Sequence, residues 1–190
     1  MKHLQLLGIS AMCLALLAAC NQNTESSVGD SASAVTTTPA ASAPVAATQA
    51  LSSKDGKISV ATSGQFSDKL SEAGQLISDI PTEQLLLLQR DEAADVLLYA
   101  ADLGKAKADA PSYLKNLSDA IKADSSLKNV EVAAPQGTQL AYQFSETAAD
   151  GDVNQACQTV HQDHIYSVCA ISNSQSPAQL AQVVANIAVK

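Results

Sequence analysis

The sequence predicts an α+β domain with a mainly antiparallel sheet and helices packed on its faces. Short alternations of apolar and polar residues, typical of half-buried strands, occur in adjacent groups, above all between residues 129 and 172. Single helical stripes, at residues 111–121 and 177–187, divide these groups. Groups of neighbouring strands split by isolated helices are typical of α+β folds.

The amino-terminal residues have the pattern of a secretory signal peptide. One positive charge at Lys2 precedes an apolar run from Leu4 to Ala19. As a helix these residues would reach about 24 Å, less than the roughly 30 Å hydrocarbon core of a bilayer. Residues 1–19 are therefore expected to be a cleaved signal and not a spanning helix.

The apolar run ends at the residues LAAC, 17–20, which resemble the lipobox of bacterial lipoproteins. Lipid on the Cys20 thiol and on its freed amine would anchor the protein stably in a membrane, because one acyl chain gives only marginal membrane binding and two or more give stable binding. We therefore expect a membrane partner, held through the lipid anchor. The outer membrane is favoured over the inner one, because an aspartate after the cysteine is the usual signal for retention in the inner membrane and this chain has Asn21 at that position. The alternative is an ordinary signal peptide with an accidental cysteine.

Residues 20–53 differ in composition from the rest of the chain. Between Asn21 and Ala50, twenty of thirty residues are Ala, Ser, Thr or Pro, and no apolar period runs through them. Such a segment buries too little surface to offset the entropy of ordering. It is expected to be a flexible tether spanning roughly 30 Å as a coil. The folded domain is expected at residues 54–190.

The charge of the chain argues against one class of partner. The formal net charge is −8, and loss of Lys2 with the signal would make it one unit more negative. No local cluster of basic residues opposes this charge, so phosphate backbones are repelled. We therefore expect no nucleic acid partner.

The first part of the domain leaves one segment ambiguous. Lys57–Thr62 alternates after a turn signal and predicts a strand, whereas residues 67–80 show no decisive period. Residues 81–104 favour a helix by propensity. Their two apolar cores, Leu85–Leu88 and Val96–Ala101, also fit two strands joined by a short charged loop. Periodicity leaves both structures open.

The second part of the domain is more regular. Pro111 can begin a helix, strands are predicted around Asn129–Ala133 and through residues 140–144, and two further strands at Gln155–His161 and 165–172. A last helix is expected to begin at Ser176 as N-cap. Its apolar stripe is expected to contain Leu180, Val183, Val184 and Ile187.

This order of elements resembles the DcrB family of bacterial lipoproteins. The resemblance rests on the lipobox, the tether, the DGKIS start of the domain, the helix around PSYLKNLSDAIK, the strands that follow and the final helix. It implies a PsbP-like fold, an antiparallel sheet with helices on its faces, over residues 54–190. It also favours the hairpin over the helix for residues 84–102. The family implies no catalytic residues.

The stretch CQTVHQDHIYSVC, 157–169, holds a cysteine pair that departs from the family. If residues 162–164 form the loop, His161 faces Ile165 and Cys157 falls opposite Cys169. Facing residues lie about 4.5–5.5 Å apart at Cα, within reach of a disulfide. Outside the cytoplasm such bonds persist. A redox pair would instead have the Cys-x-x-Cys spacing, so we predict a structural disulfide.

The same stretch offers weak metal candidates in His161, Asp163 and His164. A tetrahedral zinc site needs four ligands, and these residues supply two or three. A loop tip also rarely provides the surrounding hydrogen-bond partners that orient metal ligands. An exposed, metal-free tip is the expectation, and no cofactor is expected.

Three function classes follow from the sequence. The favoured class is a non-catalytic, membrane-anchored envelope lipoprotein that binds or supports another envelope component, an unidentified protein. The alternatives are a periplasmic metal-binding protein that uses the tip, and an unrecognised hydrolase. The common nucleotide-binding, serine-hydrolase and zinc-protease motifs do not occur in the sequence, so we do not expect an enzyme.

Overall fold

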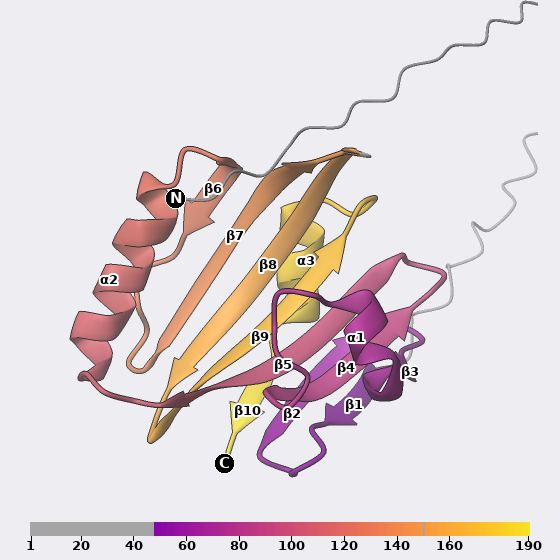
Figure 1. The fold of residues 1–190 in the computed structure, drawn as a ribbon, viewed down its shortest axis with the longest axis horizontal. Coiled ribbons are helices and arrows are strands. Elements are labelled where there is room, and N and C mark those ends of the chain that lie inside the picture. Colours follow the sequence, from indigo (N-terminus) through magenta and orange to yellow (C-terminus); the bar gives the residue numbers. More distant parts are fainter. Residues whose placement is uncertain (1–47, 150) are drawn as a thin grey trace, which may run out of the picture. The chain divides into compact units, whose positions relative to one another are not determined.

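The computed structural model describes residues 48–149 and 151–190, and these residues form an α+β domain (Figure 1). Its strands build two antiparallel sheets. The larger has the order β3-β4-β5-β9-β8-β7-β6, and the smaller has the order β1-β2-β10. The predicted fold class, a mainly antiparallel sheet with helices, is confirmed.

Along the chain, helical segments separate groups of consecutive strands. The strands are β1 (Thr48–Ser52), β2 (Ile58–Ser63), β3 (Ser67–Asp68), β4 (Leu85–Asp91), β5 (Val96–Lys105), β6 (Leu127–Val132), β7 (Gln139–Ala148), β8 (Gly151–His161), β9 (His164–Ser172) and β10 (Ile187–Val189). The helices are the 3-10 turn η1 (Leu70–Glu72), α1 (Ala73–Leu76), α2 (Ala110–Ala123) and α3 (Pro177–Val183).

The large sheet buries a different apolar cluster on each face. On the face that we call the α3 face, Ala156, Val168 and Leu98 pack with Leu180 and Val184 and with the small sheet. The opposite face, the α2 face, packs against the segment from η1 to residue 80, and its cluster contains Tyr99, Cys157 and Cys169. Helix α2 contacts β6 and β7 at one end of the sheet.

The ambiguous segment is a hairpin, β4 and β5, as the resemblance favoured. Leu85–Leu88 are all buried, so both faces of this strand are covered. Such a strand has the continuous apolar pattern of a helical core, and tertiary packing decides between the two. Asp95, at φ 53°, makes the turn together with the carboxylate of Asp91.

Asp91 is the buried charge that holds this turn. Its carboxylate accepts hydrogen bonds from the backbone N–H groups of Gln65 (2.7 Å), Ala93 and Ala94 (both 3.0 Å). Burial opposes ionisation, but these three donors outweigh it and hold the pKa of Asp91 below its ordinary value. Gly64 is required beside it, because an added Cβ would lie 2.7 Å from the carboxylate.

Two expectations are corrected by the structure. Residues 48–52, assigned to the tether, form β1: Leu51 is buried, and the Gln49 side chain binds the backbone of Phe66. Ile187, assigned to the last helix, lies in β10 opposite Val60. The helix ends at Val183 because the β-branched residues after it complete the small sheet.

The Asp91 interactions predict a pH-dependent stability difference. Asp91→Asn removes a charged acceptor from three N–H donors and should cost about 2 kcal/mol at pH 7. A folded-state pKa below the ordinary 3.8 means that this stability is present above pH 3.8 and is lost as the pH falls through the folded-state pKa. Urea unfolding at pH 7 and in acid measures both. Exposed Glu83→Gln is the control, and a cost that is the same at every pH would contradict the mechanism.

Candidate functional site

The predicted disulfide lies at the centre of the large sheet. Strands β8 and β9 pair with His161 opposite Ile165 and Cys157 opposite Cys169, the register expected from a three-residue loop. The two cysteines are bonded, with Cα atoms 4.1 Å apart, and each is only 1% exposed. Because solvent and other thiols do not reach these sulfur atoms, the bond is a structural staple.

The tip of this hairpin differs from its predicted exposed state. His161 is buried: its Nε2 lies 2.9 Å from the carbonyl oxygen of Ala108, and its ring contacts Tyr113. The segment that precedes α2 therefore covers this histidine. No local pattern around His161 indicates the contact, because its partners lie about fifty residues away along the chain.

His164 has a separate partner. Its Nδ1 lies 2.8 and 2.9 Å from the two carboxylate oxygens of Asp102 on β5, while Asp163 is exposed. Within residues 48–149 and 151–190, no three histidine, cysteine or carboxylate side chains are arranged to hold a metal ion. His164 and Asp163 line a hollow of about 570 Å³ whose other charged residues are Lys57, Lys105 and Lys190. Three ammonium groups disfavour a cation there.

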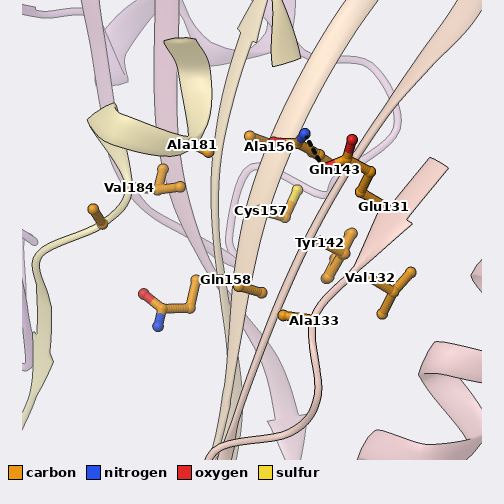
Figure 2. A pocket seen from close by; sticks show the side chains of 12 residues that line it. Glu131, Val132, Ala133, Tyr142, Gln143, Ala156, Cys157, Gln158, Ala181 and Val184 are labelled. Atoms are coloured by element: carbon orange, nitrogen blue, oxygen red, sulfur yellow. Dashed lines mark hydrogen bonds between the residues drawn. The ribbon is translucent and has the colours of Figure 1, made fainter. Parts of the chain in front are cut away.

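A different feature has the form of a binding site, a groove on the α3 face of the sheet. Its floor is the α3 face of β6, β7 and β8, and one wall is the carboxyl-terminal part of α3 (Figure 2). Its volume is about 410 Å³. Small apolar side chains make up much of its lining, namely Ala133, Ala141, Ala156, Ala181, Val184 and Ala185. Its polar side chains are those of Glu131, Gln143 and Gln158.

The groove is open because α3 is short. The helix packs over β8 and its neighbours, where Ala156 joins the buried cluster, but leaves Ala141 and Ala133 exposed. Figure 2 shows Ala181 and Val184 on one side of the groove, with Glu131, Val132 and Ala133 on the opposite side. The small side chains make this floor shallow and apolar.

The polar groups of the groove favour hydrogen-bond donors. Gln143 donates to Glu131 (2.8 Å, dashed in Figure 2), and Gln158 donates to Gln139 (2.9 Å). The Oε1 atom of Gln158 is buried and, among the described residues, has no hydrogen-bond partner. Glu131 is the one charged residue in the lining. The groove therefore offers the negative charge of the Glu131 carboxylate to a ligand.

The groove was not predicted from the sequence. Alanine and glutamine at alternate positions of β7 and β8 have the pattern of a solvated sheet face. The open floor depends on where α3 ends, which the sequence placed too late by assigning Ile187 to that helix. The one signal that could have indicated the groove is the alternation Ala141-Tyr142-Gln143-Phe144, which puts small and amide side chains on one face of the strand.

Comparison with known proteins adds no relative: no protein-family model and no curated protein matches this chain. The resemblance to the DcrB lipoproteins stays a prediction from the sequence. Among the described residues, no helix is long and apolar enough to cross a membrane. Residues 1–20, which carry the predicted signal and Cys20, lie outside the described residues.

The disulfide predicts a defined loss of stability on reduction. Opening a loop of this length should lower the free energy of unfolding by about 3 kcal/mol, since the unfolded chain regains conformational freedom. Urea unfolding with and without a reductant measures the difference, and a Cys157→Ala/Cys169→Ala variant should not respond to the reductant. Digestion without reduction should give the two cysteine peptides joined. Separate, unlinked peptides would refute the bond.

Proposed function

We propose that this protein is a non-catalytic lipoprotein of the bacterial cell envelope whose folded domain binds another envelope protein. A lipid on Cys20 anchors it, with the outer membrane favoured over the inner and the domain facing the periplasm. The observation that carries the proposal is the apolar run ending at LAAC, with Cys20 followed at once by polar sequence.

The disulfide supports the proposed compartment. Disulfides form and persist in the periplasm and outside the cell, and are rare in the cytoplasm. Cys157 and Cys169 are bonded in the core of the sheet, where they stabilise the fold and have no access to a thiol substrate. This pattern is typical of an exported domain.

The groove on the α3 face is the proposed binding surface. Its alanine lining fits small apolar side chains, while the Glu131 carboxylate fits hydrogen-bond donors or a positive charge. A polypeptide segment supplies all of these groups, and its amide N–H groups are the donors. An unidentified envelope protein is therefore the proposed partner.

The anchoring predicts the behaviour of a Cys20→Ala variant. Without the thiol, no diacylglycerol is attached, so the variant should appear in the soluble fraction or accumulate with its signal uncleaved. Cell fractionation and amino-terminal mass analysis measure both properties. If the variant fractionates with membranes as the native protein does, and has the same mature amino terminus, Cys20 is not the anchor.

The binding role predicts a site-specific cross-link. A photo-cross-linking residue placed at Ala141, in the groove, should give one defined adduct in intact cells, whereas the same residue at the exposed Ala120 of α2 should not. Ala133→Arg should abolish the Ala141 adduct, because a long side chain would occupy the groove. Adducts from both positions, or an Ala141 adduct that survives Ala133→Arg, would count against the groove.

A further inference from the structure

Strand β6 is an edge of the large sheet, and its α3 face forms the outer part of the groove floor. It pairs with β7 alone among the described strands. The N–H of Ala133 donates to the carbonyl of Ala141 (2.9 Å). Because backbone groups alternate in direction along an antiparallel strand, Val132 at the end of β6 directs its N–H and C=O groups away from β7, and the same alternation carried past the Ala133 hydrogen bond assigns Ala134 to that side. These groups are available to another strand.

The two halves of this edge differ. At its start, Lys128 places a charge on the strand, Asn129 has a φ of 52°, and the pairing shifts between Lys128 and Glu131. Charges and bulges of this kind protect sheet edges from unwanted pairing. From residue 130 to 134, in contrast, the sequence VEVAA carries one charge and ends at Pro135. The unprotected half is the half that lines the groove.

We propose that an extended segment of the partner protein adds to β6 as a further strand at residues 130–134. The backbone groups of Val132 and Ala134 hold it, and its alternate side chains point over the groove. This inference rests on the proposed function, because it uses the same groove.

The chemistry of the added segment follows from what lies beside it. A residue opposite Glu131 on a neighbouring strand would lie about 4.5–5.5 Å from it at Cβ, where opposite charges attract. Glu131 is the one charged residue of the groove lining, on a chain whose net charge is −8. The segment therefore has lysine or arginine opposite Glu131, and small side chains at the other positions that face the alanines.

Amide hydrogen exchange of the labelled full chain in non-ionic detergent tests the pairing. The probe is a peptide of alternating alanine and threonine with one central lysine, and the control has glutamate in its place. At a peptide concentration tenfold above its Kd, exchange of the Val132 and Ala134 amides should slow about tenfold. The Ala133 amide, already bonded to β7, should not change. No slowing with the lysine peptide, or equal slowing with both peptides, would overturn the proposal.

Val132→Pro separates strand addition from other use of the groove. Proline removes an N–H that points away from β7, and an edge strand tolerates it. The variant should lose peptide binding and the Ala141 cross-link, while Val132→Ala keeps both. If the cross-link survives Val132→Pro, strand addition is wrong and the groove still binds. If no Ala141 adduct forms in the native protein, the proposed function itself fails.

Exchange measured without peptide at several protein concentrations tests for self-association. If exchange of the Val132 and Ala134 amides slows as the protein concentration rises, a second copy of the chain occupies the edge, and the proposal is overturned.

Discussion

The pairing of β8 with β9 is the constraint on which the rest of the large sheet depends. The two strands are central, with β5 and β7 on either side of them. Cys157 opposite Cys169 places both sulfur atoms on the α2 face, and so places Ala156 and Gln158 on the α3 face. A slip of one residue would exchange the faces. The faces of β7 follow from those of β8, because Ala141 pairs with Gln158 and therefore lies on the same face.

The covalent bond matters for this register because the side-chain pattern of β8 specifies it weakly. Between residues 155 and 161, QACQTVH places both apolar and polar residues on each face of the strand, and no large aliphatic residue except Val160 marks a face. Registers are poorly determined in strands of this kind. The tight turn at residues 162–163 and the disulfide together determine the register of β8 against β9, which apolar burial alone would specify weakly. The disulfide therefore contributes specificity as well as stability.

Local patterns in the sequence predicted most strands, and the exceptions have physical causes. The hairpin β4–β5 was ambiguous because a strand buried on both faces loses the alternation that distinguishes it from a helix. Strand β1 was assigned to the tether because TQALS shares the tether's composition, and only its pairing with β2 sets it apart. His161 was expected in solvent because its cover, Ala108 and Tyr113, comes from a distant part of the chain. The disulfide was predictable because a short loop places Cys157 opposite Cys169 and because the predicted export of the domain favours disulfide formation.

An exposed sheet face and edge carry a risk of aggregation, and the residues around the groove limit it. Large aliphatic side chains on the α3 face of β7 would form an adhesive apolar patch, whereas alanine and glutamine leave only a shallow apolar floor. On β6, Lys128 and the left-handed Asn129 protect one end, and Pro135 stands just beyond the other. The unprotected length is therefore about five residues, which suits a short strand and is too little for extended pairing between copies. The same residues that limit aggregation thus also bound the stretch where we propose that a partner strand adds.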